Sequence, residues 1–122
     1  MGRIQISDDA LYTRELLKKI VKETKHEVVA EATTGDEAIE LYRQVKPDLV
    51  LLDIVMPPGK STLNGMEALK RILEEDPSAN VVICSALEQQ VLIEEALRVG
   101  AKDFIAKPIM PERILEVLSK YC

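Results

Sequence analysis

No block of basic residues occurs in this chain of 122 residues, which carries a formal net charge of −5 from 16 Lys and Arg against 21 Asp and Glu. Proteins that bind nucleic acid draw most of their affinity from basic side chains on phosphates, so nucleic acid is not expected as a direct ligand. Apolar runs of the ~20 residues that span a bilayer are also missing, as is a signal-peptide pattern. We therefore expect a cytoplasmic protein without membrane insertion.

Aromatic residues and cysteines are scarce as well. With no Trp, one Phe and three Tyr, the hydrophobic core must be built mainly from Val, Ile, Leu and Ala. The two cysteines, Cys84 and Cys122, have no metal-site spacing and are too few for a disulfide framework. Cys84 lies in an apolar run, where it is interpreted as a small buried hydrophobic residue. The length predicts one domain over residues 1–122, with a core that needs no cross-links.

Short apolar runs alternate with longer amphipathic runs along the chain. Five short runs predict strands: Ile4 up to Asp8, Val28 to Ala32, Leu49 to Leu52, Val81 to Cys84, and Phe104 to Ala106. The third run is apolar throughout, as in a strand that is buried on both faces of a parallel sheet. Helical spacing elsewhere predicts five helices, with Thr34 capping the second and Gly100 ending the fourth in an αL conformation. Together they predict an α/β fold, a doubly wound parallel sheet between two helical layers.

Polar side chains stand where four of the predicted strands end. Asp8 and Asp9 follow the first strand, Asp53 the third, Ser85 the fourth, and Lys107 the fifth. The carboxyl ends of parallel strands are where ligands bind in such sheets. Carboxylates brought together need a cation between them, and Mg²⁺ combines a few carboxylates with waters and phosphate oxygens. The set therefore predicts a Mg²⁺ site beside a carboxylate, Asp53, that accepts a phosphoryl group.

Each of these residues also has a purely structural interpretation. Asp8 or Asp9 would serve as a helix cap, Asp53 as the start of a local turn, and Ser85 as a second helix cap. Lys107 would then be a solvated strand end. The functional interpretation uses a hydroxyl that donates to one phosphoryl oxygen and an ammonium that balances another. Polar residues at four strand ends at once favour the functional interpretation.

These residues resemble the receiver domain of two-component response regulators, of the single-domain chemotaxis type (CheY-like). The resemblance runs from about Arg3 to Lys120. It rests on Asp8-Asp9, Asp53-Ile-Val-Met-Pro, Asn64-Gly, Ser85-Ala, and Gly100-Ala-Lys-Asp-Phe-Ile-Ala-Lys-Pro. It implies a flavodoxin-like three-layer sandwich with strand order 2-1-3-4-5. It also implies that Asp53 is the phosphoacceptor and that Asp8, Asp9, Asp53 and the main-chain carbonyl of Val55 bind Mg²⁺.

The resemblance further implies a switch and its partners. Ser85 would be the switch hydroxyl, Phe104 the switch aromatic, and Lys107 the phosphate-binding lysine before a cis bond to Pro108. The phosphoryl donor would be a sensor histidine kinase or a phosphotransfer protein. Such a protein is a phosphoacceptor rather than an enzyme, and we expect a monomer. Its output would be a protein target bound by the fourth helix, fifth strand and fifth helix, around Gln90, Ile93, Phe104 and Ile109.

Two features depart from the family pattern. Gln5 and Ser7 fall on one face of the first strand, so this face is either partly wet or its polar side chains have partners. The loop before Asn64-Gly is longer than usual in the family. It contains Gly59-Lys-Ser-Thr, but Ile54 stands where a P-loop needs its first glycine, so nucleotide binding is not expected. We interpret Pro58 to Leu63 as a solvated insertion.

Other functions share parts of this pattern. A phosphorelay intermediate has the same site and length, so chemotaxis and phosphorelay both stay open. A haloacid dehalogenase-like phosphohydrolase would also use an aspartate nucleophile, yet it usually carries a second Asp two residues later, where this chain has Val55. A receiver that only mediates contacts would not need Asp53, Ser85 and Lys107 intact. His26, the one histidine, is interpreted as a surface residue because the donor histidine belongs to the kinase.

Overall fold

The computed structural model describes residues 2–56 and 64–122, and within them five parallel strands form one sheet in the order β2-β1-β3-β4-β5. The strands are β1 (Arg3–Ser7), β2 (Glu27–Ala32), β3 (Leu49–Asp53), β4 (Val81–Ala86) and β5 (Asp103–Lys107). The helices are α1 (Leu11–Lys22), α2 (Gly35–Val45), α3 (Gly65–Glu75), α4 (Gln90–Val99) and α5 (Pro111–Tyr121), with a 3₁₀ turn at Leu87–Gln89. The predicted fold class and strand order are confirmed.

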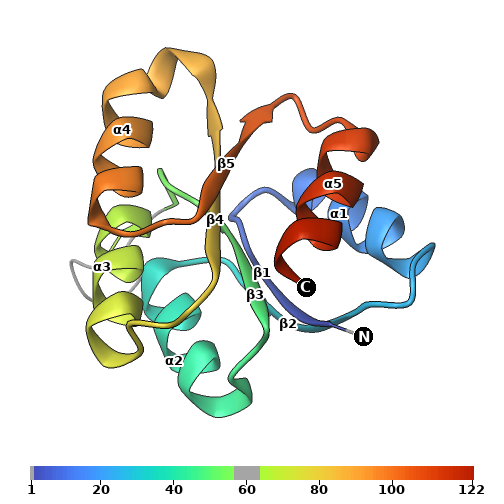
Figure 1. The fold of residues 1–122 in the computed structure, drawn as a ribbon, viewed down its shortest axis with the longest axis horizontal. Coiled ribbons are helices and arrows are strands. Elements are labelled where there is room, and N and C mark those ends of the chain that lie inside the picture. Colours follow the sequence, from blue (N-terminus) through green and yellow to red (C-terminus); the bar gives the residue numbers. More distant parts are fainter. Residues whose placement is uncertain (1, 57–63) are drawn as a thin grey trace.

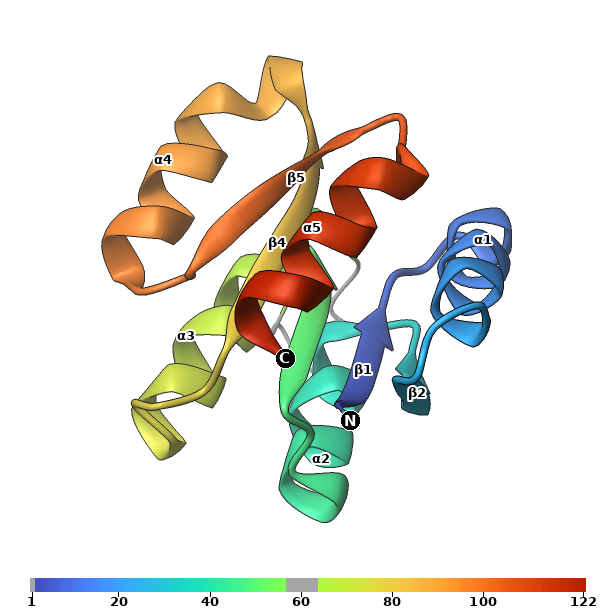
Figure 2. The same cartoon turned by 45° about the vertical axis from the view of Figure 1, so that its right-hand side comes forward.

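Two apolar cores lie on opposite faces of the sheet, and Figures 1 and 2 show the helices that cover each. Side chains of α1 and α5 pack on one face, and those of α2, α3 and α4 on the other. Every residue of β3 is buried, as expected for a strand covered on both sides. Cys84 is buried in the α1/α5 core as predicted, and burial raises the pKa of its thiol to about 12. None of the described helices is long and apolar enough to cross a membrane.

The polar face of β1 is dry and finds partners inside the protein. Gln5 and Ser7 are 0% and 1% exposed. The Gln5 amide nitrogen donates to the carbonyl oxygen of Ala38 in α2 at 2.9 Å and to the Ser7 hydroxyl at 3.2 Å. Its amide oxygen has no hydrogen-bond partner within the described part of the chain. Of the two possibilities left by the sequence, buried partners account for most, though not all, of these polar groups.

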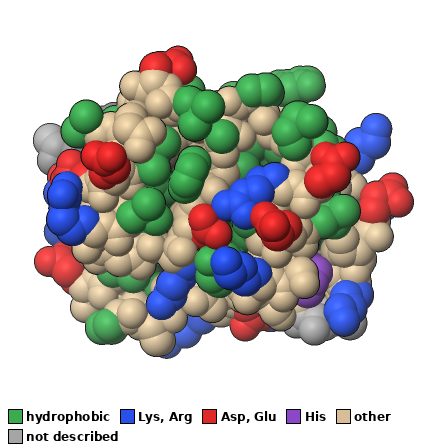
Figure 3. Space-filling model, turned by 45° about the horizontal axis from the view of Figure 1, so that its top comes forward, with side chains coloured by type: hydrophobic (Ala, Val, Ile, Leu, Met, Phe, Trp, Pro, Cys, Tyr) green, Lys and Arg blue, Asp and Glu red, His purple; other side chains and the backbone are tan. Residues whose placement is uncertain are grey.

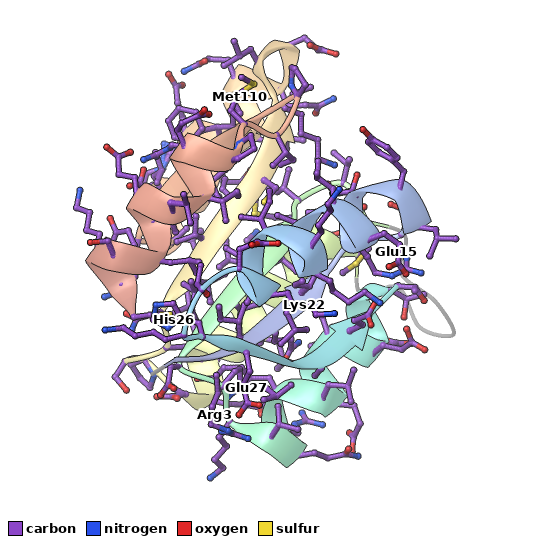
Figure 4. All side chains as sticks on the ribbon, turned by 90° about the vertical axis from the view of Figure 1, so that its right-hand side faces the viewer. Arg3, Glu15, Lys22, His26, Glu27 and Met110 are labelled. Carbon is purple, nitrogen blue, oxygen red and sulfur yellow. The ribbon has the colours of Figure 1, made fainter. Side chains whose placement is uncertain are left out.

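Helix ends follow the capping residues in the sequence. The Thr34 hydroxyl accepts from the N–H of Glu37 and caps α2, as predicted. At the other end of α2, the Arg3 guanidinium donates to the carbonyl oxygens of Val45 and Lys46 at 2.7 and 3.0 Å (Figure 4). Gly100 ends α4 with φ = +136°, a positive value as expected but beyond the αL region.

His26 is a partly exposed residue that also makes a structural contact. It lies between α1 and β2 (Figure 4), and its Nδ1 accepts from the N–H of Gly2 at 2.7 Å. Burial lowers the pKa of His26, and nearby positive charge lowers it further. The acceptor role at Nδ1 requires the neutral ring, which agrees with that direction. His26 is therefore tied to the start of β1 and takes no part in the strand-end cluster.

Replacing Lys46 by glycine should stabilise the folded protein. It is an exposed, non-glycine residue at φ = +44°, a conformation that disfavours a Cβ. We expect Lys46→Gly to raise the free energy of unfolding by roughly 0.5–1 kcal/mol, after allowing for the greater flexibility of glycine in the unfolded chain. Urea titration measures the change. Lys46→Ala keeps the Cβ and is the matched control; equal stabilisation by both variants would contradict the backbone explanation.

Candidate metal centre and phosphoryl site

The predicted site residues meet at the carboxyl edge of the sheet. Asp8 and Asp9 follow β1, while Asp53 and Lys107 end β3 and β5. A carboxylate oxygen from each of Asp8, Asp9 and Asp53 lies within 4.8 Å of the other two. Figure 3 turns this edge toward the viewer and shows acidic and basic side chains together near the middle of the surface, with hydrophobic side chains around them. The sheet thus brings together residues that are far apart in the sequence.

Asp8 is the most completely held member of the cluster. It is 2% exposed, and its Oδ1 accepts from the N–H of Ala10 at 2.9 Å while its Oδ2 accepts from Lys107 Nζ at 3.1 Å. The N-cap of α1 is Ala10, without a side-chain capping bond. The helix-cap interpretation of Asp8 and Asp9 is therefore wrong. Asp9, in contrast, is exposed beside this buried carboxylate.

Asp53 is buried, and its neighbours shift the pKa of its carboxyl in opposite directions. Burial raises the pKa of its carboxyl, and the charge of Asp8 adds to this, while the N–H of Val55 and the ammonium of Lys107 act in the other direction. The Val55 N–H donates to Oδ1 at 3.1 Å, and Lys107 Nζ lies 3.4 Å from Oδ2. Asp53 thus makes the local turn of its structural interpretation and also faces the cluster. The same turn places Val55 directly beside the carboxylate.

Lys107 balances part of the negative charge. Burial works against its ammonium, yet the charges of Asp53 and Asp8 outweigh burial and raise its pKa. Its side chain is 27% exposed and ion-paired, so it is not the solvated strand end of the structural interpretation. Three carboxylates and one ammonium leave an excess of two negative charges. A hard divalent cation with oxygen ligands fits this set, which suits Mg²⁺.

Ser85 and Phe104 lie on the face of the sheet that α4 covers. Ser85 is 1% exposed within β4, and its hydroxyl donates to the carbonyl oxygen of Ala86 at 3.3 Å, so it does not cap the following helix. Phe104 is half-buried against the α2–α4 core. In the β4–β5 register Ser85 is opposite Ala106, which is two residues from Phe104 and on the same face. The Lys107–Pro108 bond is cis, as the resemblance implied.

The expected output surface needs one correction. Ile93 is 1% exposed and belongs to the core beneath α4, so it is not available to a partner. Residues of the α4–β5–α5 face that are exposed or line its hollow include Gln90, Leu87, Val91, Phe104, Met110 and Arg113. The hollow has a volume of about 380 Å³. The Gly59-Lys-Ser-Thr segment and the proposed insertion lie outside the described residues.

Gly65 has a structural role that the sequence did not explain. It opens α3, and a Cβ there would lie 2.3 Å from the carbonyl oxygen of Asp53 and 2.5 Å from that of Ile54. Its N–H donates to the carbonyl oxygen of Met56 at 3.0 Å. The start of α3 is thus pressed against the end of β3. The Asn64-Gly pair was the available signal, because Asn64 caps α3 and a glycine beside a cap often marks a close backbone approach.

Comparison with known proteins shows the family of this chain. Residues 4–119 match the model of the response regulator receiver domain. The chain is 47% identical to the chemotaxis protein CheY of Thermotoga maritima over 97% of this chain and 95% of that protein. It is 49% identical to the chemotaxis protein CheY of Listeria monocytogenes over 98% of each. A solved CheX-CheY-BeF3-Mg²⁺ complex from Borrelia burgdorferi contains a chain with TM-score 0.88 and 32% identity, covering 98% of this chain and 89% of that one.

The chain therefore belongs to the response regulator receiver domain family. Its similarity to chemotaxis proteins named CheY extends over nearly the full length of both sequences. The fold and the strand-end cluster described above agree with that membership.

A methyl group at Gly65 should displace the carbonyl oxygen of Asp53 and disturb the candidate metal site. We expect Gly65→Ala to lower the free energy of unfolding by about 1–3 kcal/mol and to weaken Mg²⁺ binding in calorimetric titrations. Asn64→Ala is the matched control, since it removes the cap of α3 at a cost of about 1 kcal/mol but leaves the contact with Asp53 free of a new atom. Equal Mg²⁺ affinity in Gly65→Ala and Asn64→Ala would contradict the inference that the close contact at Gly65 supports the metal site.

Proposed function

We propose that this protein, as a receiver domain over residues 1–122, accepts a phosphoryl group on Asp53 in a Mg²⁺-dependent reaction and signals in chemotaxis. The donor would be the phosphohistidine of a sensor histidine kinase or a phosphotransfer protein. The observation that supports this most directly is the cluster of Asp8, Asp9 and Asp53 with Lys107 between two of its carboxylates. Full-length similarity to CheY proteins supports the chemotaxis role and a cytoplasmic location.

The chain's own groups account for the chemistry at the carboxylate. An oxygen of Asp53 would attack the phosphorus, so that an O–P bond forms while the P–N bond to the donor imidazole breaks. Asp8, Asp9, Asp53 and the carbonyl of Val55 would hold Mg²⁺, which supplies screening of the charges that meet in this step. Lys107 would neutralise one phosphoryl oxygen, and the Ser85 hydroxyl would donate to another. Asp53 is 3% exposed, so its own carboxylate is largely shielded from bulk water.

A phosphorelay role uses the same site and differs only in the partner. Chemotaxis is favoured because relatives matched over nearly their full length, those of Thermotoga maritima and Listeria monocytogenes among them, are named for it. A dehalogenase-like hydrolase is not favoured, since Val55 occupies the position of the second Asp and has no acid or base to offer. We therefore treat the protein as a phosphoacceptor that promotes its own phosphorylation, not as an enzyme acting on a separate substrate.

The phosphoacceptor assignment predicts one modification at one residue. Acetyl phosphate with Mg²⁺ should add a single phosphoryl group, seen as about 80 Da by intact-mass measurement, because the acyl phosphate forms by carboxylate attack. Asp53→Asn should abolish it while leaving the far-UV circular dichroism unchanged. Glu27→Gln, at an exposed carboxylate on β2 outside the cluster, is the control and should be phosphorylated normally. Modification that persists in Asp53→Asn, or after Mg²⁺ is chelated, would refute the assignment.

Phosphorylation would then be transmitted along one face of the sheet. Among residues 2–56 and 64–122, the Ser85 hydroxyl donates to its neighbour's carbonyl at 3.3 Å, a long bond, so it can be redirected toward a phosphoryl oxygen. Its movement would leave space beside the Ala106–Phe104 row, into which the half-buried Phe104 ring can turn. This would reshape the hollow lined by Leu87 and Phe104, where we propose that the target protein binds.

Beryllofluoride with Mg²⁺ tests the switch because it stands in for the phosphoryl group. We expect amide NMR shifts to spread from Asp53 to Val91, Phe104 and Met110. Ser85→Ala lacks the hydroxyl and should confine the shifts to the neighbourhood of Asp53. Wild-type shifts that never reach α4 or Phe104 would show that this face is not the output. Distant shifts that survive in Ser85→Ala would show that the signal takes another route.

A further inference from the structure

Every polar group of Asp8 has a hydrogen-bond partner, and Arg14 supplies the partner of its main-chain carbonyl oxygen. The N–H of Asp8 donates to the carbonyl oxygen of Ala32 at 2.9 Å, and its two carboxylate oxygens accept from Ala10 and Lys107. The remaining group, the main-chain carbonyl oxygen, accepts from Nη1 of Arg14 at 2.9 Å. All four polar groups of Asp8 therefore have partners. Two of these partners within the described residues are side chains: Lys107 bonds the carboxylate of Asp8, and Arg14 bonds its main chain.

Arg14 is itself anchored on the neighbouring strand. Its Nε donates to Oε1 of Glu31 in β2 at 3.2 Å, and only 13% of its side chain is exposed. Glu31 is held in turn by Lys18, whose Nζ lies 3.0 Å from Oε2. Lys18 also pairs with Glu15, which Figure 4 places on α1. The guanidinium thus spans from β2 to the turn between β1 and α1, and its planar fork suits two partners at fixed angles.

We propose that Arg14 is a positioning residue for the candidate metal site, acting through the backbone of Asp8. By fixing the Asp8 carbonyl, it holds the turn that aims the carboxylates of Asp8 and Asp9 toward Asp53. The inference rests on the proposed metal role of these carboxylates. Groups that orient metal ligands without touching the metal affect its affinity by about 10–100-fold.

Charge alone would predict the opposite effect. A guanidinium near a cation site repels the incoming cation, so removal of Arg14 should strengthen Mg²⁺ binding if its charge were what mattered. Glu31 neutralises much of that charge, which leaves the geometric effect as the larger one. Positioning therefore predicts weaker binding after Arg14 is removed. The sign of the change separates the two explanations.

The test compares three variants by NMR titration of the full chain with Mg²⁺ alone. Arg14→Met keeps an apolar stem but no donor, and we expect about tenfold weaker binding. Arg14→Lys keeps the charge without the fork, and we expect binding between those of Arg14→Met and the wild type. Lys19→Gln removes an exposed cation of the same helix that lies outside this network, and we expect it to bind like the wild type.

A measurement without metal supports or overturns the same proposal. In the Mg²⁺-free protein, Arg14→Met should speed hydrogen exchange at the Asp8 amide, while amides within β3 and β4 keep their wild-type rates. If Arg14→Met does not fold, hydrogen exchange at the Asp8 amide is compared between Arg14→Lys and the wild type. Unchanged or tighter Mg²⁺ binding in the Arg14 variants would overturn the positioning role alone. A wild-type protein that binds no Mg²⁺ would overturn the proposed function, and the inference with it.

Discussion

The ammonium of Lys107, placed between the carboxylates of Asp8 and Asp53, is the contact on which the candidate site depends. Lys107 Nζ lies 3.1 Å from Oδ2 of Asp8, which is 99 positions away in the sequence, and 3.4 Å from Oδ2 of Asp53, which is 54 positions away. Asp8 and Asp53 are 2% and 3% exposed, and buried carboxylates without a partner are strongly unfavourable. The pair of ion pairs can form only when β1, β3 and β5 all lie in register in one sheet. The electrostatics of the site and the topology of the fold therefore require each other.

The parallel sheet also places the proposed metal ligands and the proposed switch residues, Ser85 and Phe104, in different parts of the structure. Alternation along a strand sends successive side chains to opposite faces, so Ser85 and Phe104 share the α4 face. Cys84 points to the α1/α5 core instead, where burial raises the pKa of its thiol. The carboxylates of Asp8, Asp9 and Asp53 gather at the carboxyl edge of the sheet. In the proposed function, a phosphoryl group at that edge would act on the α4 face.

The strand-end residues could be predicted from the sequence because apolar runs end sharply at Asp8, Asp53, Ser85 and Lys107. Other features could not. Val91, Leu92 and Ile93 are apolar in succession, so helical spacing does not tell which of them is buried, and Ile93 proved to be core. The partners of Gln5 depend on how α2 lies against β1, and the role of Gly65 depends on how closely α3 approaches β3. How closely two elements pack leaves no repeating pattern in the sequence, so it could not be predicted from the spacing of residues.

The charge of the cluster explains why a phosphoryl group on Asp53, if it forms as we propose, would act as a switch. The three carboxylates exceed the one ammonium by two charges, which a divalent cation would balance. An acyl phosphate would then add negative charge and new acceptor oxygens at a buried position, and unpaired acceptors there are unfavourable. A donor on the α4 face is the Ser85 hydroxyl, whose present bond to the carbonyl oxygen of Ala86 is long at 3.3 Å. Redirecting it replaces a weak contact by a charge-assisted one. A difference of a few kcal/mol between two packings of Phe104 is then enough for the phosphoryl group to decide which one prevails.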